Sequence, residues 1–160
     1  MLLIPGFAFA DDLQIYKNSE AQYSVSVPTT WIRRDQKIPD HVNAIEIISP
    51  RHEGSLLIMT EKKGANCKEV LAKLEKDRKL SNLLKPDERV ISAADLQKAH
   101  AQEGLRGRYE FPVAEKTQPI EQRALCLRKG AQKQILLGTF RKKNGPDLLE
   151  AILKSFSFNN

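Results

Sequence analysis

Apolar and polar residues alternate in short runs along the first third of the chain, which predicts β-strands. Residues 23–27 place Tyr, Val and Val at every second position with serines between them, the period of a strand with one buried face. Pro28 ends this run because proline has no amide hydrogen for a sheet. Two β-rich runs at 44–49 and 55–60, separated by Pro50, indicate a pair of neighbouring strands.

The second half of the chain shows the same period more clearly. Residues 104–111 alternate charged residues with apolar or aromatic ones, and Gly107 within them suggests a bulge or a close neighbour. Two further runs, 120–128 and 132–141, flank Gly130, which can adopt the unusual dihedrals of a tight turn. We therefore expect a β-hairpin there.

A change to helical period occurs after residue 66. Asn66 can accept a hydrogen bond as an N-cap, and Glu69 stands three positions later, as in a capping box. An apolar stripe follows, but it drifts around the axis beyond 77–79, so we expect fraying or a bend there and an end before Pro86. Residues 90–93 are expected to form a weak strand.

A second helix is expected to begin at Pro146, with its apolar residues on one face. The chain thus has strands, a helix, strands and a helix, with hairpins in place of regular strand–helix alternation. This order predicts the α+β class, an antiparallel sheet sandwiched by helices.

The first ten residues are apolar and precede the acidic pair at 11–12. Ala8 and Ala10 match the small-residue cleavage site of a secretory signal, and the segment is shorter than the ~20 residues that span a bilayer. We expect Met1–Ala10 to be the remnant of a signal peptide cleaved after Ala10, leaving 11–160 as a single exported domain. A basic n-region is missing, so a buried N-terminal arm is the alternative.

The composition of the chain is basic. The chain has 26 Lys and Arg against 20 Asp and Glu, a formal net charge of +6, with 29% charged and 41% apolar residues. Such a surplus favours anionic partners through long-range attraction, although it is also ordinary for a small domain that has to stay soluble. Neither disorder nor a transmembrane span is indicated.

Two cysteines, Cys67 and Cys126, lie 59 positions apart. In an oxidising compartment they could form a disulfide worth on the order of 4 kcal/mol, or they could remain two separate buried thiols. A structural zinc site needs about four clustered Cys or His ligands, which the chain does not supply. We expect no metal site and no cofactor, since the glycine-rich phosphate-binding motifs are absent as well.

Several runs resemble the PsbP/Mog superfamily in order and spacing. Residues 23–31 resemble its first strand, which ends in proline with a tryptophan shortly after, and 149–156 resemble its last helix with a Ser-Phe pair. The strand at 104–111 and the hairpin at 120–140 occur in matching order. The resemblance implies an antiparallel sheet sandwiched by helices and carries no catalytic motif.

Members of this superfamily do unlike things, so a shared fold does not decide function. The photosystem II subunit supports retention of inorganic cofactors, Mog proteins bind the GTPase Ran, and DcrB-like bacterial proteins belong to the cell envelope. With a leader that indicates export, the resemblance favours the envelope branch. We therefore expect a periplasmic or secreted, non-enzymatic protein that binds an envelope protein or an anionic envelope component.

Basic clusters are the candidate contacts for such a partner: Arg106, Arg108, Arg141, Lys142 and Lys143. Solvated faces are the alternative interpretation of each cluster. Nucleic acid is not the expected partner, because the aromatic residues of strand 104–111 lie on the face opposite its arginines instead of between them.

A different class of function is the alternative. A small periplasmic hydrolase or thiol enzyme could use Cys67, whose thiol pKa a helix N-terminus can lower, with His41 or His100 as base. This requires a cysteine and a histidine within about 4 Å of each other, and a disulfide to Cys126 would count against it. A weak metal or small-ligand carrier, using Asp40, His41 and His52, is a third possibility.

Overall fold

The computed structural model describes residues 12–160 apart from 52, 63–65, 82, 112–119 and 142–144. The expected leader, Met1–Ala10, lies outside the described residues. The described part contains ten strands, three α-helices and one short 3-10 helix, and all of its strand pairs are antiparallel. The α+β class and the antiparallel sheet with helices packed on it are thus confirmed.

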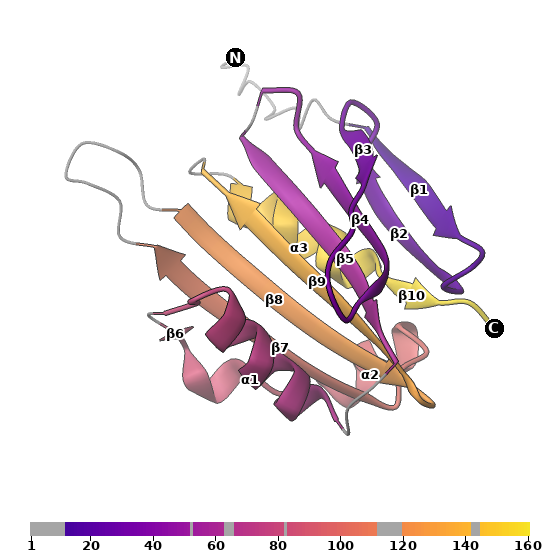
Figure 1. Cartoon of the computed structure of the whole chain (residues 1–160), viewed down its shortest axis with the longest axis vertical. Coiled ribbons are helices and arrows are strands. Elements are labelled where there is room, and N and C mark those ends of the chain that lie inside the picture. The colour runs from indigo at the N-terminus through magenta and orange to yellow at the C-terminus, as the bar shows by residue number, and fades with distance from the viewer. Residues whose placement is uncertain (1–11, 52, 63–65, 82, 112–119, 142–144) are drawn as a thin grey trace, which may run out of the picture.

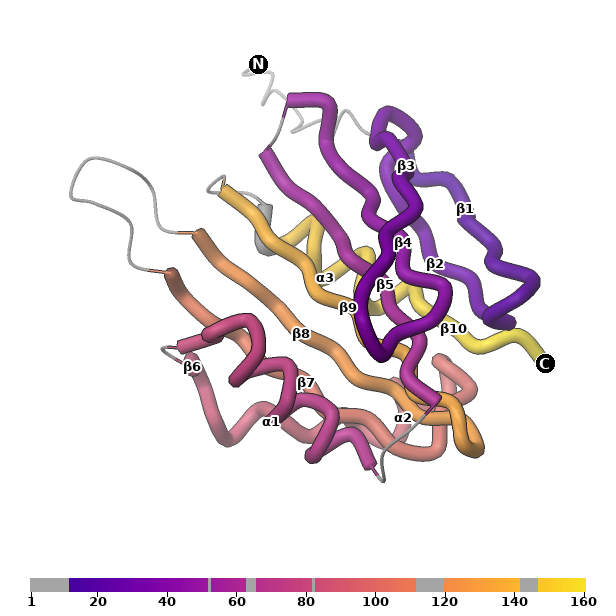
Figure 2. The backbone as a smooth tube through the Cα atoms, viewed as in Figure 1, coloured from indigo at the N-terminus to yellow at the C-terminus, as the bar shows by residue number. Residues whose placement is uncertain are grey.

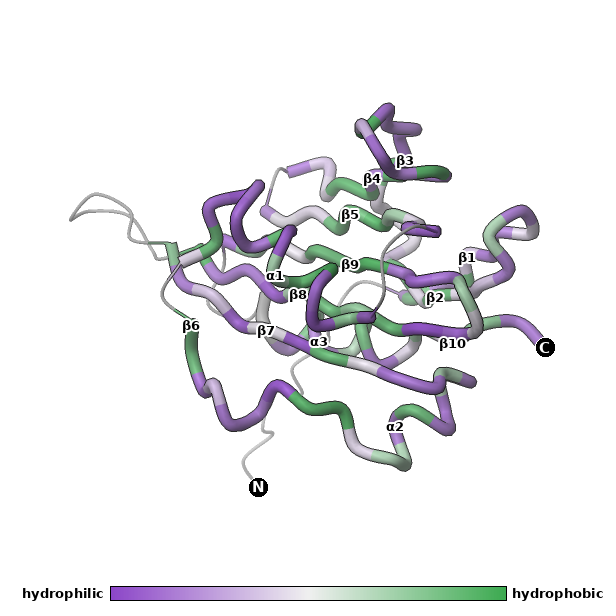
Figure 3. Tube along the Cα trace, turned by 60° about the horizontal axis from the view of Figure 1, so that its bottom comes forward, coloured by the Kyte–Doolittle hydropathy of each residue, from purple (hydrophilic) through white to green (hydrophobic). Residues whose placement is uncertain are grey.

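Seven strands form the large sheet, in which β9 and β8 are central. Its spatial order is β3 (Ile32–Asp35), β4 (Val42–Ile48), β5 (Gly54–Glu61), β9 (Gln132–Phe140), β8 (Ile120–Lys129), β7 (Glu103–Phe111) and β6 (Leu83–Leu84). The hydrophobic stretches of β8 and β9 run through the middle of the molecule (Figure 3). The expected hairpin is therefore the centre of the fold, and Gly130 turns it with a φ of 59°.

Three strands form a smaller sheet beside the large one (Figure 2). Its order is β1 (Leu13–Asn18), β2 (Tyr23–Pro28) and β10 (Ser157–Phe158), so the C-terminal residues pair with the first strongly alternating run. Neither β1 nor β10 was predicted from the sequence, since β1 is largely exposed and β10 has only two residues.

The helices lie on both faces of the large sheet (Figure 1). Helix α1 (Cys67–Asp77) crosses β7 and β8 on one face, and α3 (Gly145–Ser155) packs against β8, β9 and β2 on the other. The short η1 (Pro86–Glu88) and α2 (Ala93–Lys98) lie in the connection that leads to β7. Helix α1 begins at the predicted cap, where Asn66 accepts the backbone N–H of Glu69, and Ser92 caps α2 in the same way by accepting the backbone N–H of Asp95.

Two hydrophobic cores result, one on each face of the large sheet. The first lies between that sheet, the small sheet and α3, and it contains Trp31, which stacks on Phe140 with ring centroids 5.7 Å apart. The second lies under α1 and contains Leu71 and Leu74. Trp31 is thus a core residue.

One sequence expectation was wrong, and two further segments form elements that were not predicted. Residues 90–93 do not form a strand, because Ser92 caps α2 and Val90 makes only an isolated bridge to Leu105. Helix α1 ends at Asp77, at the start of the region 77–79 where fraying or a bend was expected, and Leu83 and Leu84 beyond it form the unpredicted strand β6. The polar run after Trp31, for which no element was predicted, forms the edge strand β3, where exposed side chains are tolerated.

Two glycines let helical segments approach the sheet. A Cβ on Gly104 would lie 2.8 Å from the Leu127 side chain and 2.9 Å from that of Leu96 in α2, and a Cβ on Gly138 would collide with Leu149 of α3. The missing side chains therefore determine how closely α2 and α3 pack on the sheet.

Candidate functional site

A cavity of about 280 Å³ lies on the α3 face of the large sheet, where β7 and β8 meet α2 and α3. Arg106, Arg108 and Arg123 line it, and we call it the arginine cavity. Its apolar wall comes from the sheet and from α3: Leu125, Leu127, Leu153 and Phe156. Cationic side chains outnumber acidic ones among the described lining residues, five to three, with Lys98 and Lys154 as the other two cations.

Strand alternation brings the arginines onto this face. Arg108 lies directly opposite Arg123 in the β7–β8 ladder, and Arg106 precedes Arg108 by two positions, so all three side chains leave the sheet on the same side. The next positions on the other side, Gly107 and Tyr109, lie on the α1 face. The periodicity of residues 104–111 thus predicts the arginine face directly.

Two glutamates hold the arginines in place. Oε1 of Glu121 accepts from Nε of Arg123 at 2.9 Å and from Nε of Arg108 at 3.0 Å. Glu150 of α3 accepts from Nη1 of Arg123 at 2.6 Å and from Nη1 of Arg106 at 3.4 Å. The Nε of Arg106 also donates to the carbonyl of Glu88 at 2.8 Å.

The three arginines differ in exposure. The side chain of Arg123 is only 10% exposed, whereas those of Arg106 and Arg108 are 36% and 30% exposed. Arg123 therefore acts as a buried tie between β8 and α3, and the other two present part of their guanidinium groups to the cavity mouth. Guanidinium groups bind carboxylates and phosphates through paired hydrogen bonds, so this arrangement can bind an anionic group.

The other basic residues that the sequence singled out do not join this cavity. Arg141 follows the end of β9, donates its N–H to the carbonyl of Glu53 at 3.0 Å and is not among the lining residues. Lys142 and Lys143 lie outside the described residues. The sequence analysis missed Arg123 and Glu150. Arg123 stands two positions before Leu125 at the start of an apolar run, so strand alternation was the available signal for it. Glu150 is one of two acidic residues of α3, and no local pattern marks it as a partner of the arginines.

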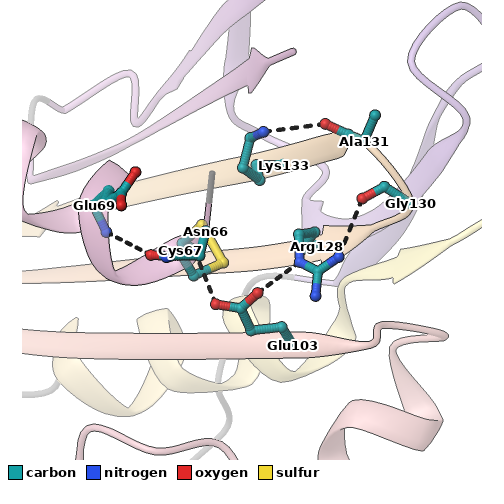
Figure 4. Close-up of a disulfide and its surroundings, with 9 residues drawn as sticks. Asn66, Cys67, Glu69, Glu103, Arg128, Gly130, Ala131 and Lys133 are labelled. Atoms are coloured by element: carbon teal, nitrogen blue, oxygen red, sulfur yellow. Dashed lines mark hydrogen bonds and ion pairs between the residues drawn. A yellow bond between two sulfur atoms is a disulfide. The ribbon is translucent and has the colours of Figure 1, made fainter. Parts of the chain in front are cut away.

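The structure joins Cys67 and Cys126 in a disulfide between the first turn of α1 and β8 (Figure 4). Their Cα atoms are 5.5 Å apart, and both residues are fully buried. Glu103 of β7 accepts the backbone N–H of Cys67 at 2.9 Å and pairs with Arg128 at 2.6 Å. The start of α1 is thus fixed to the sheet covalently and by hydrogen bonds.

The disulfide removes the chemical basis of the thiol-enzyme alternative. A thiolate is the nucleophile in such enzymes, and the bridge leaves none at Cys67. His41 lies beside Glu61, with Nε2 3.8 Å from Oε2, and His100 is exposed with a φ of 53°. His52 lies outside the described residues.

Two general features of the described residues bear on cofactors and membranes. Among them, no three His, Cys, Asp or Glu side chains are grouped so that they could hold a metal ion. No helix in the described part of the chain is both long and apolar enough to cross a membrane.

The arrangement of one antiparallel sheet between α1 on one face and α3 with a small sheet on the other defines an α+β sandwich of the PsbP/Mog-like type. Neither models of known families nor curated protein sequences match the chain. Solved structures do match it, over nearly its whole length. The solution structure of the cyanobacterial PsbP protein (CyanoP) from Synechocystis sp. PCC 6803 is 13% identical, covers 99% of this chain and 98% of its own, and has a TM-score of 0.65.

Two other solved structures have a similar fold. The Ran-binding protein Mog1p of Saccharomyces cerevisiae is 10% identical, covers 92% of this chain and 96% of its own, and has a TM-score of 0.56. LpqN, involved in cell envelope biogenesis of Mycobacterium tuberculosis, is 8% identical, covers 93% and 91%, and has a TM-score of 0.56. At these identities the comparison shows the fold alone, and it confirms the fold that the resemblance to PsbP and Mog proteins implied.

Proposed function

We propose that this protein is an exported, non-enzymatic protein of the bacterial cell envelope that binds a macromolecular partner bearing anionic groups. The arginine cavity is the binding site in this proposal. The observation that carries it is the placement of Arg106 and Arg108, partly exposed and held by glutamates, beside an apolar wall.

Preorganisation is the physical reason that this cavity suits binding. Glu121 and Glu150 fix the guanidinium planes before any partner arrives, so less side-chain entropy is lost on association. The exposed parts of Arg106 and Arg108 supply charge-assisted hydrogen bonds, and the wall of Leu153 and Phe156 supplies apolar contact. The net charge of +6 adds long-range attraction to the approach of an anionic partner.

The neighbouring structures support a binding role of this kind. Mog1p is a Ran-binding protein, and LpqN is involved in cell envelope biogenesis. An acidic protein surface is the partner that we propose first, because the cavity of about 280 Å³ is small and its mouth combines charge with apolar contact. Export rests on the apolar leader, and the mature protein is proposed to begin at Asp11.

Crosslinking in intact cells, followed by mass spectrometry of the captured protein, tests the proposal. Replacing both Arg106 and Arg108 by Gln removes two charges from the cavity, and we expect capture to fall about tenfold, since charge-assisted contacts at an interface are worth this much. The double replacement of Arg34 and Arg51 by Gln is the control, because it removes the same charge from exposed sites elsewhere.

A separate variant tests the basic run at 141–143. Replacing Arg141, Lys142 and Lys143 together by Glu is expected to weaken capture through the lost long-range attraction, without unfolding the domain. If this variant alone loses capture and the double Gln variant is unaffected, the binding site lies at the end of β9 and not in the arginine cavity. If the protein binds phosphatidylglycerol vesicles and no protein is captured, the partner is an anionic lipid surface and not an acidic protein.

A further inference from the structure

The two sheets of the described residues end in four edge strands, and three of these are protected against pairing with another chain. An edge strand has unpaired backbone groups, which proteins protect with charged side chains, a short strand or a covering segment. Three of the four residues of β3 are charged, and β6 has only two residues. Strand β10 also has two residues, and the amide of Phe158 donates to the carbonyl of Ala99 beside α2 at 3.0 Å.

Strand β1 is the unprotected edge. It has six residues, Lys17 is its only charged side chain, and in the described part of the chain it pairs with β2 alone. Leu13 and Ile15 leave the strand on the same face as Lys17, and they are 46% and 68% exposed. Figure 1 and Figure 3 show β1 at the margin of the molecule, outside β3. A strand of this length and exposure is a template for pairing with a further strand.

Alternate residues of β1 direct their N–H and C=O groups away from β2: Leu13, Ile15 and Lys17. The alternation follows from the ladder, in which residue pairs that exchange hydrogen bonds alternate with pairs that do not. The amide of Thr29 donates to the carbonyl of Asp12 at 2.9 Å, so every second pair from there on is bonded. Ser26 lies opposite Ile15, and its amide donates to Oγ of Ser155 at 2.8 Å and not to β1. The outward groups of β1 are therefore available to another strand.

We infer that β1 pairs with β1 of a second copy of this chain, antiparallel, with the Ile15 residues of the two copies opposite each other. In this register the three outward residues of one strand lie opposite the same three residues of the other. Every outward N–H and C=O of both strands then has a partner. Leu13 lies opposite Lys17 of the second copy, whose alkyl chain can cover it. The two small sheets become one continuous antiparallel sheet.

The charge pattern of β1 selects a second copy as the occupant. Like charges directly opposite each other weaken a strand pair. Lys17 stands two positions beyond Ile15, so the antiparallel pair places the two lysines at opposite ends of the new ladder, each beside an apolar residue. The pairing is independent of the arginine cavity, whose described lining contains no residue of β1. A dimer carries two such cavities, so a partner with repeated acidic groups gains avidity, and this consequence alone rests on the proposed function.

Sedimentation equilibrium of the purified protein tests the pairing at about 0.15 M salt, where repulsion between two chains of net charge +6 is screened. We expect a dimer with a Kd on the order of 100 µM, because one strand pair buries less area than a stable interface. Ile15→Lys places like charges directly opposite each other, and we expect it to weaken the dimer at least about tenfold. Gln14→Lys is the matched control. It adds the same charge to an exposed neighbour that lies opposite Tyr16 of the second copy, and the dimer should persist.

Cysteine crosslinking tests the register independently. The two native cysteines are joined in the buried disulfide, so an introduced cysteine is the only free thiol. Ile15→Cys places the Cα atoms of the two copies about 5.5 Å apart, which a disulfide can span, and we expect a covalent dimer on mild oxidation. Leu13→Cys is the control, because its two Cα atoms would be about 14 Å apart along the antiparallel pair and should not crosslink.

The outcomes are distinguishable. A dimer that Ile15→Lys weakens and Ile15→Cys traps supports the pairing. A monomer at about 1 mM, a dimer that Ile15→Lys leaves unchanged, or equal crosslinking of Leu13→Cys and Ile15→Cys overturns it. A monomeric wild-type protein whose partner capture in cells is lost in Ile15→Lys also overturns it, and assigns β1 to a strand of that partner. Capture that depends on Arg106 and Arg108 tests the arginine cavity separately, whatever the result for β1.

Discussion

At the scale of single residues, Tyr109 shows how a polar group that enters the second core is satisfied by a specific partner. Tyr109 of β7 is buried under α1, and its hydroxyl donates to Oε1 of Glu75 at 2.5 Å. Arg89 donates to the same oxygen at 2.5 Å. Burial raises the pKa of Tyr109 above its ordinary value, and the hydrogen bond that its neutral hydroxyl donates to Glu75 raises it further.

This pKa shift predicts a specific loss of stability at high pH. The phenol of the unfolded chain ionises near pH 10, whereas the folded protein keeps Tyr109 protonated, so its contribution is complete below about pH 10 and falls as the pH rises above it. In Tyr109→Phe we expect about 1 kcal/mol lower stability at pH 7 and a shallower decline above pH 10. Urea unfolding followed through the single Trp31 at pH 7 to 11 measures both. Identical slopes for variant and wild type above pH 10 would contradict the assignment.

At the scale of elements, α1 depends on its attachments more than on its own sequence. The helix has eleven residues, which is too short to be stable alone in water. Asn66 caps its first turn, the disulfide fixes Cys67 to β8, and Val70, Leu71 and Leu74 pack on the sheet. The disulfide therefore determines where the helix lies on the sheet.

Reduction of this disulfide is expected to destabilise the protein by about 4 kcal/mol, because the bridge closes a loop of 59 residues in the unfolded chain. The urea midpoint should fall on treatment with a phosphine reductant. The double replacement of Cys67 and Cys126 by Ala is the control and should unfold at the same midpoint with or without reductant. An unchanged midpoint for the reduced wild-type protein, with free thiols verified by mass, would show that the bridge contributes no stability.

At the scale of the whole molecule, one sheet serves two cores. Strands β5, β8 and β9 contribute alternate side chains to the core beneath α1 and to the core beneath α3 and the small sheet. Leu136 and Leu137, for example, face opposite cores although they are adjacent in the chain. The two cores should therefore form and melt together.

We expect Leu71→Ala in one core and Ile152→Ala in the other each to lower stability by about 2–5 kcal/mol within a single unfolding transition. Calorimetry together with near-ultraviolet dichroism measures this. Ile15→Ala is the control, because Ile15 is 68% exposed and its loss should change stability by less than about 0.5 kcal/mol. Two separate transitions in either core variant would show that the faces fold independently.

Much of the fold could be predicted from local patterns. The hairpin around Gly130, the strand ending at Pro28, the cap at Asn66 and the final helix depend on residues near one another in the chain. The weak strand expected at 90–93 failed because a local apolar run does not distinguish a strand from the approach to a capped helix. Edge strands such as β3 and β10 form only where a partner strand already lies.

Some features of the candidate site could likewise be predicted from the sequence, and others could not. Alternation along 104–111 is a property of the sequence, and it places Arg106 and Arg108 on one face whatever the neighbours are. Their pairing with Glu121 and Glu150, the disulfide, and the meeting of His41 with Glu61 join residues that are far apart in the chain. The sequence by itself therefore determined the fold class and which residues share a face. Only the tertiary structure decided which faces meet, because register and helix docking depend on packing across the whole sheet.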